Sequence, residues 1–278
     1  MSKTDIRIAL LDMNNNHPNQ GMRNIKELSH IFKKESKYHV VVDLFDVRYK
    51  AEMPKIEDYD IFISSGGPGN PHREGYIWEG KYANFLNQIW ENNLNNDQKK
   101  YLFLVCHSFQ LAVIHWGIAN VCKRKSYSFG VMPIHKSPEG KDEMLFTNLP
   151  NTFYGVDSRA YQCIEPNHEK MEELGMSIVA IEKERPHIRL ERAMMAIRFS
   201  NEIFGTQFHP EADPFGMMEN LKDQANKQAM IDTFGMEKYL ETIDRMDDED
   251  KIVLTRAQII PRFLQFASEN IAKQFVLS

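Results

Sequence analysis

Short apolar runs alternate with amphipathic segments over the first 116 residues, and this alternation restricts the fold more than any other feature of the sequence. Runs rich in aliphatic and β-branched residues lie at 6–11, 38–47, 61–64 and 101–105. Apolar side chains recur at helical spacing over 20–34, 81–91 and 108–116. Strands that alternate with helices form parallel sheets covered by helices. We therefore expect an α/β fold with a mostly parallel central sheet flanked by helices.

The helical signal weakens between residues 126 and 207. Short runs at 143–146, 161–164, 177–181, 194–199 and 203–208 predict further strands, some of them antiparallel. Beyond residue 214 the pattern is almost entirely helical. Short helices are unstable unless their apolar faces are packed. We therefore expect one α/β domain over residues 1–214 and a helical C-terminal extension over residues 215–278 that docks on it.

Charge and cysteine content exclude several classes of protein. The 278 residues include 34 Lys and Arg against 39 Asp and Glu, a formal charge of −5, which gives no basic field for a nucleic acid. Cys106, Cys122 and Cys163 are too few for a disulfide framework and favour a reducing compartment. No apolar run approaches the roughly 18 residues that a membrane span requires. We expect a cytoplasmic protein without nucleic-acid or membrane partners.

Cys106 directly follows the apolar run 101–105 and precedes the helical segment 108–116. A thiol at such a turn lies at the carboxyl edge of a parallel sheet, where these folds bind ligands. The N-terminus of the helix favours the thiolate form through its partial positive charge. A lone cysteine is more often a small core residue. Cys106 is therefore a candidate nucleophile only if neighbouring segments supply the rest of the chemistry.

Two such segments are present. Residues 64–70, SSGGPGN, follow the run at 61–64, and their glycines let backbone N–H groups turn toward a bound oxyanion. Residues 205–211, GTQFHPE, end a predicted strand in His209, with Glu211 two residues later. An imidazole can deprotonate a thiol, and a carboxylate fixes the imidazole tautomer. If the two strands are parallel, Cys106 and His209 lie at the same edge of the sheet.

These segments, in this order, resemble the class I glutamine amidotransferase family, and in particular the glutaminase part of GMP synthase. The resemblance rests on SGGPG at 65–69, on the strand–cysteine–helix turn with Gln110 four residues after the cysteine, and on FHPE at 208–211. It covers roughly residues 6–214 and implies a flavodoxin-like fold. It also implies a nucleophile at Cys106, a base at His209 and an orienting carboxylate at Glu211.

The resemblance further implies how a substrate is held. The backbone N–H groups of Gly67 and His107 would form the oxyanion hole. The residues that would contact glutamine are Gly66, Gln110, Ser158 and Arg159. The implied reaction attacks the side-chain amide of glutamine, releases ammonia and hydrolyses a γ-glutamyl thioester. No Ser-Gly-Gly-x-Asp-Ser phosphate loop follows residue 214, so a separate synthetase is the ammonia-accepting partner that the resemblance allows.

The sequence departs from the family at two places. The family usually has Gly-x-Cys-x-Gly-x-Gln at the turn, whereas this chain has Leu104 and Ser108 at the glycine positions. Residues 155–159, GVDSR, stand where the family has Ser-His-Gly-Asp. Two alternatives therefore remain: a γ-glutamyl or other amide thiol hydrolase, and an inactive binding or regulatory module of the same fold.

The histidines do not form a metal-binding pattern. His107 and His115 lie near Cys106 but lack the spacing and the second thiolate pair of a structural zinc site. We expect no metal ion and no cofactor.

Overall fold

A nine-stranded sheet forms the centre of the described part of the chain, with the strand order β2-β1-β3-β4-β9-β8-β7-β5-β6. The computed structural model describes residues 5–184, 189, 191–222 and 224–277. The strands are β1 Asp5–Asp12, β2 His39–Asp46, β3 Ile61–Ser64, β4 Tyr101–Val105, β5 Ala119–Lys136, β6 Thr152–Pro166, β7 Ser177–Glu182, β8 Met194–Arg198 and β9 Ile203–Thr206. The helices are α1 Gln20–Glu35, α2 Ile77–Asn95, α3 His107–Trp116, α4 His168–Glu173, α5 Pro214–Lys222, α6 Gln224–Phe234, α7 Met236–Asp247 and α8 Leu254–Leu277.

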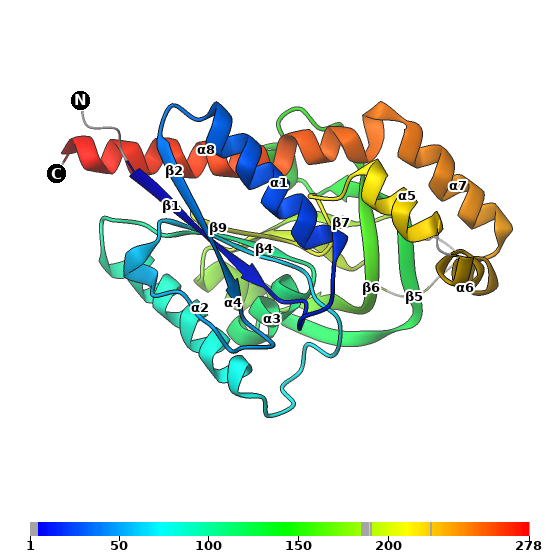
Figure 1. Cartoon of the computed structure of the whole chain (residues 1–278). Helices are drawn as coiled ribbons and strands as arrows, with labels where there is room; N and C mark the ends of the chain where they lie inside the picture. Colours follow the sequence, from blue (N-terminus) through cyan, green and yellow to red (C-terminus); the bar gives the residue numbers. More distant parts are fainter. Residues whose placement is uncertain (1–4, 185–188, 190, 223, 278) are drawn as a thin grey trace.

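The strands β2, β1, β3, β4 and β9 run parallel. Helices α1 and α8 cover one face of this half, and α2 and α3 cover the other (Figure 1). Because both faces are covered, every residue of β3 and β4 is buried, which explains why all of them except Ser64 are apolar. The parallel register places the ends of β3, β4 and β9 at one edge, as the sequence predicts for Cys106 and His209.

The strands β8, β7, β5 and β6 continue the sheet by antiparallel pairing. The long strands β5 and β6 form a ribbon, shown in green in Figure 1. Val156, in β6, accepts a 2.8 Å hydrogen bond from the backbone N–H of His209, so the ribbon contacts the edge where the parallel strands end.

The prediction of a strand at residues 143–146 is wrong. This segment forms a 3-10 turn over Met144–Phe146, capped by the Glu143 carboxylate, which accepts a 3.0 Å hydrogen bond from the Leu145 N–H. Leu145 and Phe146 are fully buried in the core beneath α8. A buried 3-10 turn and a short buried strand can have the same apolar composition, so periodicity alone does not distinguish the two.

Residues beyond 214 pack against the sheet and the ribbon. In α8, Phe263 lies edge-to-face on Phe103 of β4, with ring centroids 5.2 Å apart. A second group of buried side chains joins α5, α6 and α7 to the ribbon through Met217, Met230 and Met246. The division of the chain at residue 214 stays a prediction. No helix in the described residues is long and apolar enough to cross a membrane.

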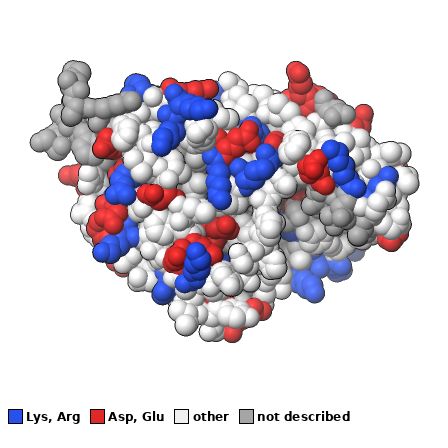
Figure 2. Space-filling model, viewed as in Figure 1, with Lys and Arg blue, Asp and Glu red and all other residues white. Residues whose placement is uncertain are grey.

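Acidic and basic side chains are interspersed over the face shown in Figure 2. This face carries no extended field of one sign, in agreement with the near balance of charges in the sequence.

Candidate active site

Cys106 occupies a strained backbone position between β4 and α3. Its φ and ψ are 49° and −97°, and a positive φ is rare for a residue with a side chain. The Cys106 N–H donates a 2.7 Å hydrogen bond to the Thr206 carbonyl at the end of β9, and the Cys106 carbonyl accepts one from Gln110 N–H at 3.0 Å. Such strain persists where the surroundings fix the backbone, commonly at reactive sites. The thiol is thereby held at the N-terminus of α3.

The two residues that replace the usual glycines are both accommodated. Leu104 pairs across the sheet with Gly205, and a Cβ on Gly205 would lie only 3.2 Å from the Leu104 Cβ and 2.9 Å from Phe109. Gly205 on the neighbouring strand therefore leaves room for the Leu104 and Phe109 side chains. Ser108 is buried, and its hydroxyl donates a 2.6 Å hydrogen bond to the Ser65 carbonyl. This bond ties α3 to the glycine-rich loop.

His209 and Glu211 form a buried pair next to Cys106. The His209 Nδ1 lies 2.8 Å from the Glu211 Oε1, and the two side chains are 18% and 1% exposed. Burial by itself lowers the pKa of His209, but the charge of Glu211, the charge of Cys106 and hydrogen bonds to both outweigh burial and raise it well above its usual value. The arrangement therefore favours a positively charged imidazole beside the sulfur.

The glycine-rich loop packs against both of these residues. A Cβ on Gly66 would lie 2.8 Å from His209 Cε1 and 3.4 Å from Cys106 Cβ, and one on Gly67 would lie 2.2 Å from the Met13 carbonyl oxygen. Only glycine fits either position without displacing a neighbour. His107 is the first residue of α3, so its N–H has no carbonyl partner within the helix.

The side chain of His107 turns into the protein. It is 1% exposed, and its ring centroid lies 6.5 Å from that of Trp78. Burial and the nearby charge of Arg48 lower the pKa of His107 to about 3. Its imidazole is therefore neutral at physiological pH.

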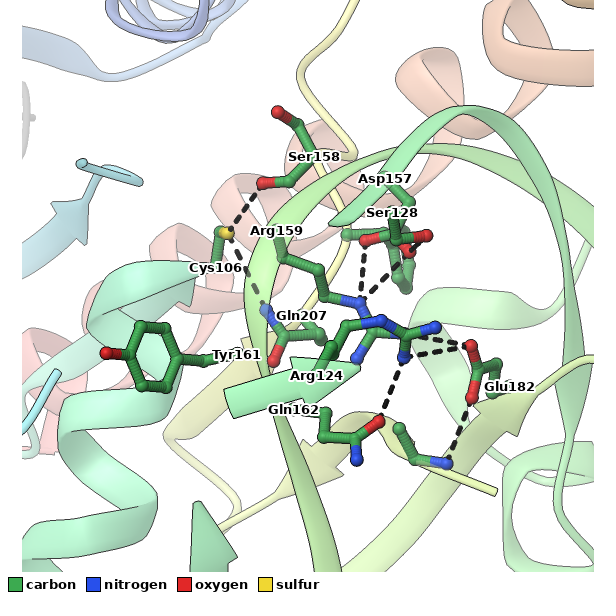
Figure 3. Close-up of polar contacts among 12 residues, drawn as sticks. Cys106, Arg124, Ser128, Asp157, Ser158, Arg159, Tyr161, Gln162, Glu182 and Gln207 are labelled. Carbon is green, nitrogen blue, oxygen red and sulfur yellow. Dashed lines mark hydrogen bonds and ion pairs between the residues drawn. The ribbon is translucent and has the colours of Figure 1, made fainter. Parts of the chain in front are cut away.

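Three of the residues expected to hold substrate have partners inside the protein. Gln110 Nε2 donates to the Tyr161 carbonyl at 3.4 Å and to Gln207 Oε1 at 3.0 Å. The Ser158 carbonyl lies 3.8 Å from Cys106 Sγ. Arg159 is 2% exposed and forms ion pairs with two carboxylates, those of Asp157 at 2.9 Å and Glu182 at 3.2 Å (Figure 3). A contact of any of these side chains with substrate stays a prediction.

The sequence did not single out two residues of this region. The Tyr127 hydroxyl lies 2.7 Å from the Ser158 hydroxyl, and Gln207 Nε2 lies 3.6 Å from Cys106 Sγ. Gln207 stands in the quoted segment GTQFHPE, two residues before His209, which is the only local signal for it. Tyr127 carries no such signal, because only the pairing of β5 with β6 brings it to Ser158.

A cleft of about 640 Å³ opens beside His209, between the N-terminus of α1, the ribbon and α5. Its lining includes Asn19, Arg23, Ser158, Glu211 and Met217. A larger groove, of about 780 Å³, lies between α1 and α8 and contains none of the residues described above. In the described part of the chain, no group of three or more His, Cys, Asp or Glu is arranged to hold a metal ion.

The fold and this site have known counterparts. The profile of the family "Glutamine amidotransferase class-I" matches residues 22–225. No curated protein sequence matches the chain significantly.

Solved structures share the fold at low sequence identity. A glutamine amidotransferase from Thermotoga maritima has a TM-score of 0.66 at 15% identity, over 96% of this chain and 97% of that one. The glutaminase domain of Trypanosoma brucei CTPS, solved with bound acivicin, has a TM-score of 0.54 at 16% identity, over 74% of this chain and 86% of that one. A Thermoplasma acidophilum protein assigned as a GMP synthase subunit has a TM-score of 0.50 at 16% identity, over 85% of this chain and 97% of that one.

The matched family segment spans most of the chain and includes the glycine-rich loop, the strained cysteine and the His209–Glu211 pair. The chain belongs to the class I glutamine amidotransferase family.

Proposed function

We propose that this protein is a glutaminase that hydrolyses the side-chain amide of glutamine through a thioester on Cys106 and releases ammonia. One observation carries the proposal: a thiol on a strained strand-to-helix turn lies beside a histidine whose other nitrogen is hydrogen-bonded to a buried carboxylate. This is the arrangement of a nucleophile, a base and an orienting group.

The first half-reaction forms the thioester. Glu211 engages Nδ1 of His209, so Nε2 takes the proton from Cys106 Sγ. The thiolate attacks the amide carbon, a C–S bond forms, and the carbonyl electron pair moves to the oxygen. The N–H groups of Gly67 and His107 would stabilise that oxyanion. His209 then gives its proton to the nitrogen, the C–N bond breaks and ammonia leaves.

The second half-reaction restores the thiol. A water molecule gives a proton to His209 and attacks the thioester carbon. The C–S bond breaks, glutamate leaves, and the proton on His209 returns to Cys106 Sγ. Glu211 stabilises the imidazolium in both halves and does not itself take the proton.

We further propose that the ammonia serves a separate synthetase. The described residues beyond 214 form helices that pack on the sheet and the ribbon. One protein with this fold is the glutaminase domain of CTPS and another is assigned as a GMP synthase subunit, which supports an acceptor outside this domain.

A second candidate is the hydrolysis of a larger γ-glutamyl amide. Two observations favour it. The charge of Arg159 is compensated by Asp157 and Glu182 inside the protein, which leaves it less suited to bind the α-carboxylate of free glutamine. The cleft of about 640 Å³ beside His209 also lies within the size range of pockets for drug-sized ligands.

Ammonia release from glutamine and amine release from γ-glutamyl peptides separate these functions. We expect the wild type to release ammonia from glutamine, Cys106→Ala to release none, and Cys122→Ala, which changes a cysteine on β5, to match the wild type. Release from the peptides alone would establish the second candidate. If a correctly folded protein releases neither product, both hydrolase functions are contradicted, and the inactive binding or regulatory module is the alternative that remains.

A further inference from the structure

The side chain of Gln207 connects the nucleophile to the interior of the sheet. It is fully buried just after β9, and its Nε2 lies 3.6 Å from Cys106 Sγ. Its Oε1 accepts hydrogen bonds from Gln110 Nε2 at 3.0 Å and from the Cys163 thiol at 3.8 Å. Figure 3 shows the Gln207 amide nitrogen directed at the Cys106 sulfur.

The surrounding bonds determine which end of the amide faces the sulfur. The Tyr161 carbonyl can only accept, so the Gln110 atom that bonds to it is the nitrogen. That nitrogen has a second hydrogen, and the Gln207 atom that meets it must therefore be the oxygen. The nitrogen of Gln207 is then the atom directed at Cys106 Sγ.

The sulfur has several other neighbours. The Ser158 carbonyl, 3.8 Å away, accepts from the thiol and disfavours a thiolate. His209 hydrogen-bonds to the sulfur and carries a compensating charge, supported by Glu211. Tyr127 and Cys163 also interact electrostatically with Cys106, and burial raises the pKa of both, so they remain neutral. Arg159 adds a positive charge near Cys163.

We propose that Gln207 is a catalytic residue whose carboxamide donates an N–H to the Cys106 thiolate, and that Gln110 is a positioning residue that holds the amide in the donating orientation. The assignment rests on the proposed role of Cys106 as nucleophile. It gives Gln110 a function that differs from the substrate contact expected from the sequence: its amide acts through Gln207.

The test is the pH dependence of Cys106 alkylation by iodoacetamide, followed by peptide mapping, in the full-length protein without substrate. Gln207→Met keeps the length of the side chain and removes the N–H. We expect it to move the midpoint of the profile upward by about one pH unit, since a thiolate without its donor is less stable. The plateau rate at high pH should increase, because a less stabilised thiolate is more nucleophilic.

Two further variants keep the test decisive. Gln207→Leu also removes the N–H and adds no charge, so it gives the same direction of shift if Gln207→Met fails to fold. Gln110→Met should shift the midpoint in the same direction by less, because the Gln207 amide can then rotate.

Gln162→Leu is the matched control. Its Nε2 also donates to a cysteine, Cys122, at 3.7 Å, but it does not contact Cys106. We expect its Cys106 profile to equal that of the wild type.

An unchanged midpoint in folded Gln207→Met or Gln207→Leu overturns the assignment. The profile requires no turnover, so a wild type that fails to hydrolyse glutamine would contradict the proposed function while leaving this measurement interpretable. Glutamine hydrolysis with an unmoved profile would contradict the role of Gln207 alone.

Discussion

Two histidines near Cys106 have opposite electrostatic surroundings. His209 lies beside Glu211 and Cys106, and these groups raise its pKa well above the usual value in spite of burial. His107 follows Cys106 directly in sequence, but burial and Arg48 lower its pKa to about 3. The groups that each imidazole contacts in the fold therefore determine its pKa, and its distance from Cys106 in the sequence does not.

Removing the carboxylate should change the charge state of His209. We expect Glu211→Gln to lower the pKa of His209, because it deletes the charge that opposes the cost of burial. The measurement is an NMR titration of the His209 Cε1–H signal. Glutamine turnover should fall in Glu211→Ala and fall further in His209→Ala, because the histidine transfers protons directly. An unchanged titration would exclude Glu211 as the source of the raised pKa.

His107 should make the protein sensitive to acid. Its pKa is about 3 when folded and about 6.5 when unfolded. Its contribution to stability is therefore complete above pH 6.5 and decreases as the pH falls toward 3, by about 1.4 kcal/mol per pH unit. We expect the His107 contribution to the pH dependence of the unfolding free energy, measured by urea unfolding between pH 6.5 and 4, to be absent in His107→Leu. His168→Ala, which changes an exposed histidine on α4, should keep it. Equal slopes in the wild type and His107→Leu would contradict the prediction.

Site residues that a local sequence pattern marks could be predicted. Site residues that only the pairing of distant strands brings together could not. The spacing of His209 and Glu211, and the position of Cys106 between a strand and a helix, are local features that the structure brings together. Gln207 and Tyr127 reach the sulfur and Ser158 through pairing between distant strands, which a single sequence does not specify.

At the scale of elements, β3 and β4 match the predicted strands residue for residue, because burial on both faces makes every residue except Ser64 apolar. The ribbon was not predicted as one unit. Much of it is exposed or only partly buried, and the polar stretch KRKSYS lies inside β5, where it resembles a loop. The close packing of Gly205 against Leu104 was also not predicted, since it depends on which strands are neighbours.

The close packing at Gly205 in β9 can be tested. Gly205→Ala would place a Cβ 2.9 Å from Phe109, 3.0 Å from Phe199 and 3.2 Å from the Leu104 Cβ, so we expect a loss of about 1–3 kcal/mol in the free energy of unfolding. Gly80→Ala is the matched control. It lies on α2 with open space around it and should be neutral or stabilising by up to about 1 kcal/mol. A Gly205→Ala protein as stable as the wild type would show that α3 does not need the close approach.

At the scale of the whole molecule, one face of the parallel strands is covered by the first and the last described helices of the chain, α1 and α8. Ile259, Phe263 and Leu264 of α8 are fully buried in that core. The helical character of this region follows from its periodicity. Its place on the sheet does not, because an apolar helical face does not specify its partner.

We expect removal of residues 215–278 to expose this face and cause aggregation or an earlier melting transition. Within the full chain, Phe263→Ala should cost about 3–5 kcal/mol of unfolding free energy, whereas Val253→Ala, at a position that is 38% exposed, should cost little. Denaturant unfolding measures both. A shortened chain that is monomeric, equally heat-stable and equally active would contradict docking and indicate a separable arm.

The hydrogen bond from His209 N–H to the Val156 carbonyl allows local opening of the site to be measured by amide hydrogen exchange. The backbone of His209 is held by β6. Its amide proton can exchange with deuterated solvent only when this hydrogen bond opens. Exchange protection at this one amide therefore measures how often the His209 backbone separates from the ribbon, even in the absence of any substrate.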